Sequence, residues 1–139
     1  MRRLLGVMTA LVVVGVGEPP SAADKPQVFT GKVVQLAAPP GKSAGVALAG
    51  DDGTTYPLIE DDASRMLFLD GRLRNRPVRL TAVRKPGTKD LRVVLVQTVK
   101  DGKVYDVDYW CDICQISTNY PGKCVCCGDD TELRERPAK

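Results

Sequence analysis

The cysteines of this chain lie at spacings that could hold a metal ion. All five fall between residues 111 and 127, and four of them form two Cys-x-x-Cys pairs, Cys111 with Cys114 and Cys124 with Cys127. Each pair lets one tight turn point two sulfurs at the same place, and two facing turns supply the four thiolates that tetrahedral Zn²⁺ prefers. We therefore predict a four-sulfur metal site at these residues, with Cys126 as the spare thiol.

The residues around the cysteines favour a structural site rather than a catalytic one. Gly128 follows Cys127 and permits the positive φ that lets backbone N–H groups reach thiolate sulfurs. A closed four-cysteine site leaves no open position for water or substrate. The chain contains no histidine, which removes the commonest general base and any histidine-ligated metal. We therefore expect a protein that is not an enzyme.

Two other states of the cysteines stay open. An exported chain meets an oxidising compartment, where paired cysteines often become disulfides. Full pairing of five cysteines leaves one thiol over, and the adjacent Cys126 and Cys127 rarely bridge each other. Two disulfides, or a redox dithiol at Cys111 and Cys114, are therefore the alternatives to a metal.

The cysteine segment also resembles a known family. Residues 109–129 are similar to the heavy-metal-binding domain found beside copper and silver efflux components, which reads Tyr-x-Cys-Pro-Met-His-Pro and then Pro-Gly-x-Cys-Pro-x-Cys-Gly-Met. The family's three cysteines match Cys111, Cys124 and Cys127 of this chain. Cys114 stands where the family has its histidine. The resemblance implies a thiophilic metal. Ile113 and Asp129 replace the two methionines, so Zn²⁺ is expected ahead of Cu⁺.

The first residues have the pattern of a secretory signal peptide. Arg2 and Arg3 precede an apolar run, and Ser21-Ala22-Ala23 provides the small residues of a cleavage site. The apolar run is shorter than the ~20 residues of a membrane-spanning helix. We predict that residues 1–23 are removed, that no stable membrane span remains, and that the protein is exported to the periplasm or the extracellular space.

Composition indicates one ordinary globular domain. The 139 residues are 43% hydrophobic and 27% charged, and the net charge of +3 is too small to indicate nucleic-acid binding. Four arginines cluster at positions 72, 74, 76 and 79, but the interleaved aromatic side chains of single-strand binders are missing. We expect a solvated basic face, no nucleic-acid partner, and an unidentified protein or small ligand as the partner.

The remaining patterns predict an all-β chain with one short helix. Strands are expected at 28–36, 46–49, 54–59, 78–83, 91–99 and 104–110, with tight turns at Asp51-Asp52-Gly53 and Asp101-Gly102. A helix is expected at 63–69, with Gly71 as its left-handed C-terminal residue. The stretch 91–99 is apolar on both faces, which predicts a central strand.

The order of these elements resembles the OB-fold, in which a helix lies between the third and fourth strands of a small barrel. We therefore predict a signal peptide at 1–23, an OB-like barrel at 24–108, a four-cysteine zinc-knuckle-like segment at 109–130 and a tail at 131–139.

Overall fold

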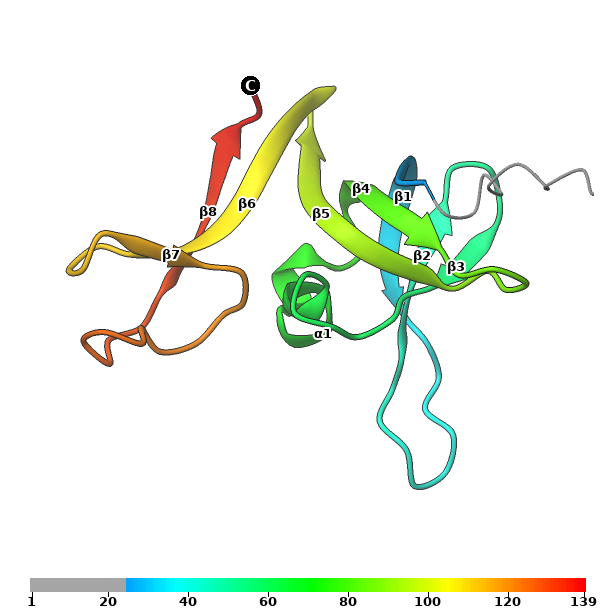
Figure 1. The fold of residues 1–139 in the computed structure, drawn as a ribbon, viewed down its shortest axis with the longest axis horizontal. Coiled ribbons are helices and arrows are strands. Elements are labelled where there is room, and N and C mark those ends of the chain that lie inside the picture. The colour runs from blue at the N-terminus through cyan, green and yellow to red at the C-terminus, as the bar shows by residue number, and fades with distance from the viewer. Residues whose placement is uncertain (1–24) are drawn as a thin grey trace, which may run out of the picture.

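The computed structural model describes residues 25–139 (Figure 1). The signal peptide predicted at 1–23 lies outside the described residues. The protein is mostly β, with one short α-helix and a 3₁₀ turn. The elements are β1 (Gln27–Gln35), β2 (Val46–Gly50), β3 (Thr55–Pro57), α1 (Arg65–Leu69), η2 (Gly71–Leu73), β4 (Pro77–Arg84), β5 (Leu91–Lys100), β6 (Lys103–Cys111), β7 (Ile116–Thr118) and β8 (Glu132–Pro137).

The strands form an open antiparallel sheet. Its order is β3-β2-β1-β4-β5-β6-β7, and β8 pairs with β6 outside this path. The sheet curves enough for the end of β3 to reach the start of β5, where Leu58 and Leu91 form a single parallel bridge. The N–H of Ile59 donates to the carbonyl oxygen of Leu91 over 2.9 Å. The predicted order of strands, with the helix between β3 and β4, is confirmed.

One hydrophobic core lies inside this curved sheet and beneath α1. The side chains of β4 alternate between the two faces of the sheet as the sequence predicts, and Val78, Leu80 and Ala82 on the inner face are fully buried. Met66 and Leu67 cover the core from the helix. The core comprises Val33, Val46, Leu48, Tyr56, Leu58, Met66, Leu67, Leu73, Val78, Leu80, Ala82, Leu91, Val93, Val96 and Tyr109.

The end of α1 differs from the prediction. Gly71 does not take a left-handed conformation; it begins η2 instead. Asp70 makes the turn, with extended backbone at φ −103°, and its carboxylate accepts a hydrogen bond from the N–H of Arg72. A side-chain cap on the following 3₁₀ turn therefore replaces the glycine cap that the sequence suggested.

β5 lies between β4 and β6, as predicted, but it does not bury both faces. Val93 and Val96 are buried, whereas Val94 is 53% exposed and Leu95 44% exposed. The register with β4 shifts between Thr81 and Ala82, so one extra residue of β5 has no partner. This β-bulge changes the phase of the alternation, which places two successive apolar residues outside.

β6 is shared by two parts of the sheet. Its first half pairs with β5 through a tight turn in which Asp101 and Gly102 both have positive φ, 50° and 72°, as the sequence predicted. Its last residues, Tyr109 to Cys111, pair with β7, and Tyr105 to Trp110 pair with β8 on the opposite edge. Residues 131–139, expected as a tail, thus contain a strand. Figure 1 shows β6 reaching from β5 to the lobe of β7 and β8.

Buried hydrogen bonds connect β6 to Asp70, the residue that follows α1. Tyr109 is fully buried and its hydroxyl donates to Asp70 over 2.7 Å. Arg72 binds the same carboxylate with two nitrogens, Nε at 2.9 Å from Oδ1 and Nη2 at 2.7 Å from Oδ2. Burial by itself would raise the pKa of Asp70, but the hydrogen bonds from Arg72 and Tyr109 outweigh it and hold that pKa below its ordinary value.

A second carboxylate joins β6 to β8. Asp108 accepts hydrogen bonds from Nε and Nη2 of Arg134, at 2.8 and 2.7 Å, and from Arg136 at 3.0 Å. These contacts lower the pKa of Asp108, Arg134 most of all. The Arg134 guanidinium also lies 3.9 Å from the centre of the Trp110 ring. β8 therefore attaches to β6 through charged and aromatic side chains as well as through its backbone.

Within residues 25–139, no helix combines the length and the apolar composition needed to cross a bilayer.

Candidate metal centre

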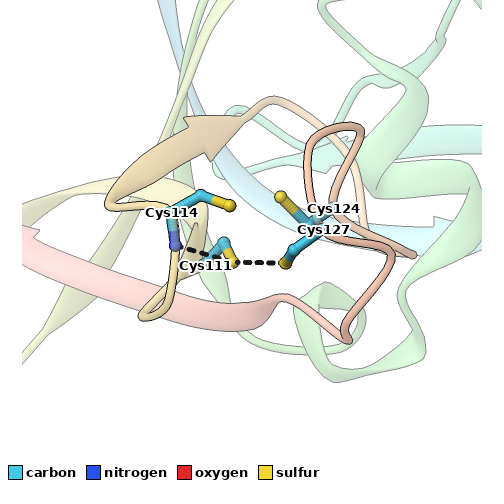
Figure 2. A group of neighbouring side chains, drawn as sticks. All are labelled: Cys111, Cys114, Cys124 and Cys127. Atoms are coloured by element: carbon cyan, nitrogen blue, oxygen red, sulfur yellow. Dashed lines mark hydrogen bonds between the residues drawn. The ribbon is translucent and has the colours of Figure 1, made fainter.

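The structure brings the four predicted cysteines together. Cys111 ends β6, Cys114 lies in the turn before β7, and Cys124 and Cys127 lie in the loop between β7 and β8 (Figure 2). Their sulfur atoms all lie within 4.8 Å of one another, and those of Cys111 and Cys127 are 3.5 Å apart. A tetrahedral ion with Zn–S bonds of about 2.3 Å separates any two sulfurs by about 3.8 Å. The cluster therefore has the size that such an ion requires.

The two Cys-x-x-Cys turns have the same backbone design. The N–H of Gln115 donates to the carbonyl oxygen of Cys111 over 2.8 Å, and that of Gly128 donates to Cys124 over 2.9 Å. Both donors have positive φ, 54° for Gln115 and 78° for Gly128. The sequence predicted this conformation at Gly128. It did not predict this conformation at Gln115. The available signal was that Gln115 follows Cys114 directly, as Gly128 follows Cys127.

Backbone N–H groups also reach the sulfurs. The N–H of Cys114 donates to Sγ of Cys111 over 3.5 Å, and the N–H of Cys126 donates to Sγ of Cys124 over 3.4 Å. Such contacts stabilise negative charge on sulfur and orient the side chain toward a shared centre. The backbone of each turn thus acts to favour the thiolate form of its first cysteine.

A small hairpin carries the second turn. Lys123 and Asp130 form an isolated bridge, and the N–H of Cys124 donates to the carbonyl oxygen of Asp129 over 2.7 Å. Thr131 donates to the carbonyl oxygen of Gly122 from both its N–H, at 3.0 Å, and its hydroxyl, at 2.8 Å. These bonds close the loop just before β8, so the pairing of β8 with β6 places the second turn opposite the first.

The cluster lies at the surface, with its inner side covered. Cys111 and Cys124 are 1% and 3% exposed, Cys114 is half-buried, and Cys126 and Cys127 are exposed. All five cysteines are free thiols in this structure. The 3.5 Å between the sulfurs of Cys111 and Cys127 is longer than the about 2.05 Å of a disulfide bond. The arrangement is a cluster about one centre.

The thiols lie so close together that their pKa values differ from one another. Hydrogen bonds from the backbone N–H groups of Cys127 and Cys126 lower the pKa of Cys124 to about 7. The neighbouring Cys126 and Cys127 side chains raise the pKa of Cys114 far above its ordinary value. For Cys111, the N–H of Cys114 acts to lower the pKa, but burial and the adjacent thiols raise it overall. Four sulfurs this close ionise together only around a cation.

The left-handed residues of the two turns give a direct test of this geometry. Gly128→Ala should lower the stability of the metal-loaded protein by about 1 kcal/mol, because alanine tolerates φ of 78° poorly although its Cβ would meet no atom within 4 Å. Gln115→Gly should raise stability by about 0.5 kcal/mol, since glycine accepts the same conformation at some cost in chain entropy. Urea unfolding measures both changes.

Gly41→Ala is the matched control for Gly128→Ala, because Gly41 has φ of 76°, equally open space, and a position in the loop between β1 and β2. It should cost similar stability and leave metal affinity unchanged, whereas Gly128→Ala should weaken metal binding. Equal metal affinities in the two variants would contradict the role assigned to the second turn.

Fold and site together define a class of protein: a mostly β chain with one short helix, whose C-terminal part carries four cysteines compatible with metal binding. No protein-family model, curated protein or solved structure matches the chain. The resemblance of residues 109–129 to the heavy-metal-binding domain, and that of the upstream elements to the OB-fold, therefore stay predictions.

Proposed function

We propose that this chain is an exported, non-enzymatic metal-binding module in which Cys111, Cys114, Cys124 and Cys127 hold one structural Zn²⁺. The observation that carries the proposal is the convergence of four sulfurs within 4.8 Å from two turns of the same design. Four thiolates fill the coordination of tetrahedral zinc, so the ion has no open position for a reaction.

The burial pattern supports a structural purpose for the ion. Between residues 112 and 131 the only buried residue is Cys124. Two of the large apolar side chains of this segment face solvent, Ile113 at 68% exposed and Val125 at 77%, and Ile116 is half-buried. The segment therefore has no hydrophobic core of its own, and metal–sulfur bonds would supply the free energy that orders it.

The ligand set favours zinc over copper. A tetrahedral four-sulfur site is typical of zinc, whereas thioether sulfur is a ligand that suits Cu⁺. Residues 109–129 contain no methionine. Cu⁺ is the second candidate metal because thiolates also bind it.

A disulfide-stabilised or thiol-redox protein is the second candidate function. It is favoured by the exposure of Cys126 and Cys127 and by the proposed export to an oxidising compartment. The cysteines would then pair covalently, and the sulfurs of Cys111 and Cys127 would have to approach from 3.5 Å.

Metal and thiol content decide between these functions. We expect the purified protein to contain one zinc per chain, to expose Cys126 alone to a thiol reagent, and to release four more thiols when zinc is chelated under denaturing conditions. A metal-free protein with one free thiol would establish two disulfides instead, and bound copper would replace zinc as the metal. The intact mass of the same sample checks the removal of residues 1–23.

The basic cluster supports the proposal that nucleic acid is not the partner. Arg72 is bound by Asp70, and Arg76 by Glu135 over 2.6 Å. Arg74 donates to the side-chain oxygen of Gln35 over 3.1 Å. Because three of the four arginines bind partners within the chain, they are poorly placed to follow a phosphate backbone.

A further inference from the structure

A second feature lies at the opposite end of the molecule from the cysteines. A pocket of about 390 Å³ is lined by Ile59, Val83, Arg84, Lys85, Pro86 and Arg92. It sits where the β4–β5 hairpin meets the chain leaving β3, beside the hydrogen bond from Ile59 to Leu91. Figure 1 shows this hairpin pointing away from β7 and the cysteine loop. The pocket volume is within the range of small-molecule sites.

The charged residues that line this pocket all carry the same sign. Three of its six lining residues, Arg84, Lys85 and Arg92, are cations. Among residues 25–139, no ion pair joins any of the three to a carboxylate, although seven ion pairs occur elsewhere. Three positive charges around one hollow repel one another, and an anion bound between them would remove that repulsion.

The Arg84 guanidinium lies beside two aromatic rings. Its guanidinium lies 5.4 Å from the centre of the Tyr56 ring and 5.9 Å from that of Phe29. These two rings pack edge to face, 5.2 Å apart. Nε of Arg84 is buried and has no hydrogen-bond acceptor among residues 25–139. Buried N–H donors almost always have an acceptor, so this nitrogen is an exception among the described residues.

The chemistry of the lining selects the ligand. Guanidinium groups bind phosphate and carboxylate oxygens through two parallel N–H bonds. A phosphate monoester carries a charge near −2 at neutral pH, which complements three cations better than one carboxylate does. Ile59, Val83 and Pro86 add an apolar wall, which favours an organic body beside the anionic head.

We propose that this pocket binds a small organic phosphate, with Arg84 and Arg92 holding the phosphate oxygens. Arg84 is pre-positioned by Tyr56 and Phe29, so little side-chain freedom is lost on binding. The proposal is independent of the metal, since the pocket shares no residue with the cysteine cluster.

The test is an NMR titration of the metal-loaded protein with phenyl phosphate, inorganic phosphate and phenol. We expect saturable shifts of the amides at positions 59, 83–85 and 92 with phenyl phosphate, weaker binding of inorganic phosphate at the same amides, and no saturation with phenol. Added salt should weaken binding, because the attraction is electrostatic. No saturation by phenyl phosphate up to about 1 mM, or shifts centred on other residues, would overturn the proposal.

Matched variants separate the pocket from general charge. Arg92→Gln should weaken phenyl phosphate binding about tenfold, and Arg84→Lys should weaken it although the charge is kept, because lysine lacks the planar fork. Lys32→Gln removes one exposed charge from β1, outside the pocket lining, and should leave binding within about twofold. Equal losses in Lys32→Gln and Arg92→Gln would show attraction to net charge alone and would refute the site.

Discussion

Replacing Cys114 with serine should abolish stable metal binding and disorder the segment after β6, while strands β1 to β5 stay folded. The variant removes one of four thiolates, and Cys124 is the only buried residue between positions 112 and 131. Metal affinity should fall by more than about 100-fold, because replacing a residue that only supports a ligand already lowers affinity by up to about 100-fold. Competition with a chromophoric chelator measures the affinity, and amide spectra report which strands remain ordered.

Cys126→Ser is the matched control, because it makes the same change at the residue next to the proposed ligand Cys127. It should leave the metal content at one ion per chain, since Cys126 lies outside the group of four sulfurs that share a centre. Full metal content in Cys114→Ser would remove Cys114 from the ligand set. Loss of metal in Cys126→Ser would show that the fifth cysteine is a ligand.

Asp70→Ala should lower the stability of the whole protein by about 3 kcal/mol. The change leaves the buried Tyr109 hydroxyl without its acceptor and removes the cap on η2 at Arg72. Thermal or urea unfolding measures the loss. Tyr109→Phe, which removes the hydroxyl but leaves the Asp70–Arg72 pair, should cost only about 1 kcal/mol.

Asp62→Ala is the surface control for Asp70→Ala. Asp62 also pairs with an arginine, Arg65 at 2.9 Å, but its side chain is 86% exposed. Exposed pairs contribute little, so we expect a loss below about 0.5 kcal/mol. A similar loss of stability in Asp62→Ala and Asp70→Ala would contradict the claim that the buried Asp70 carboxylate contributes more than an exposed one.

The pH dependence of stability should follow from the same carboxylate. The pKa of Asp70 is lower in the folded protein than its ordinary value, so the folded state binds protons less readily than the unfolded chain does. Its contribution is therefore complete above the unfolded pKa of about 4 and is lost as the pH falls through the folded pKa. Wild type and Asp70→Ala should differ most near neutral pH and converge in strong acid.

Local signals were sufficient for much of this protein. The four site cysteines could be found from spacing because each Cys-x-x-Cys turn is formed within five residues. The strand β4 was predictable because Val78, Leu80 and Ala82 alternate, and the β5–β6 turn because Asp101-Gly102 suits two positive φ angles. Each of these features depends on neighbours in sequence.

Features that depend on distant residues were not predictable. Leu133 is the only apolar side chain of β8 besides its final proline. The strand is held instead by charged residues whose partners lie elsewhere in the chain, Asp108 for Arg134 and Arg76 for Glu135. Such a segment has the composition of a solvated tail until its partners are known. The exposure of Val94 likewise follows from a register shift opposite Thr81 and Ala82, which no pattern within β5 indicates.

The shared strand β6 has a consequence for how the protein opens. Its first residues are held against β5, whose side chains belong to the large core, whereas its last residue is itself Cys111. Resistance to hydrogen exchange should therefore change along one strand, set near Lys103 by the core and at Cys111 by the proposed ion. Loss of the ion would fray β6 from its end toward Tyr109, whose bond to Asp70 marks the point where fraying stops. We therefore expect the two ends of this one strand to differ in local stability.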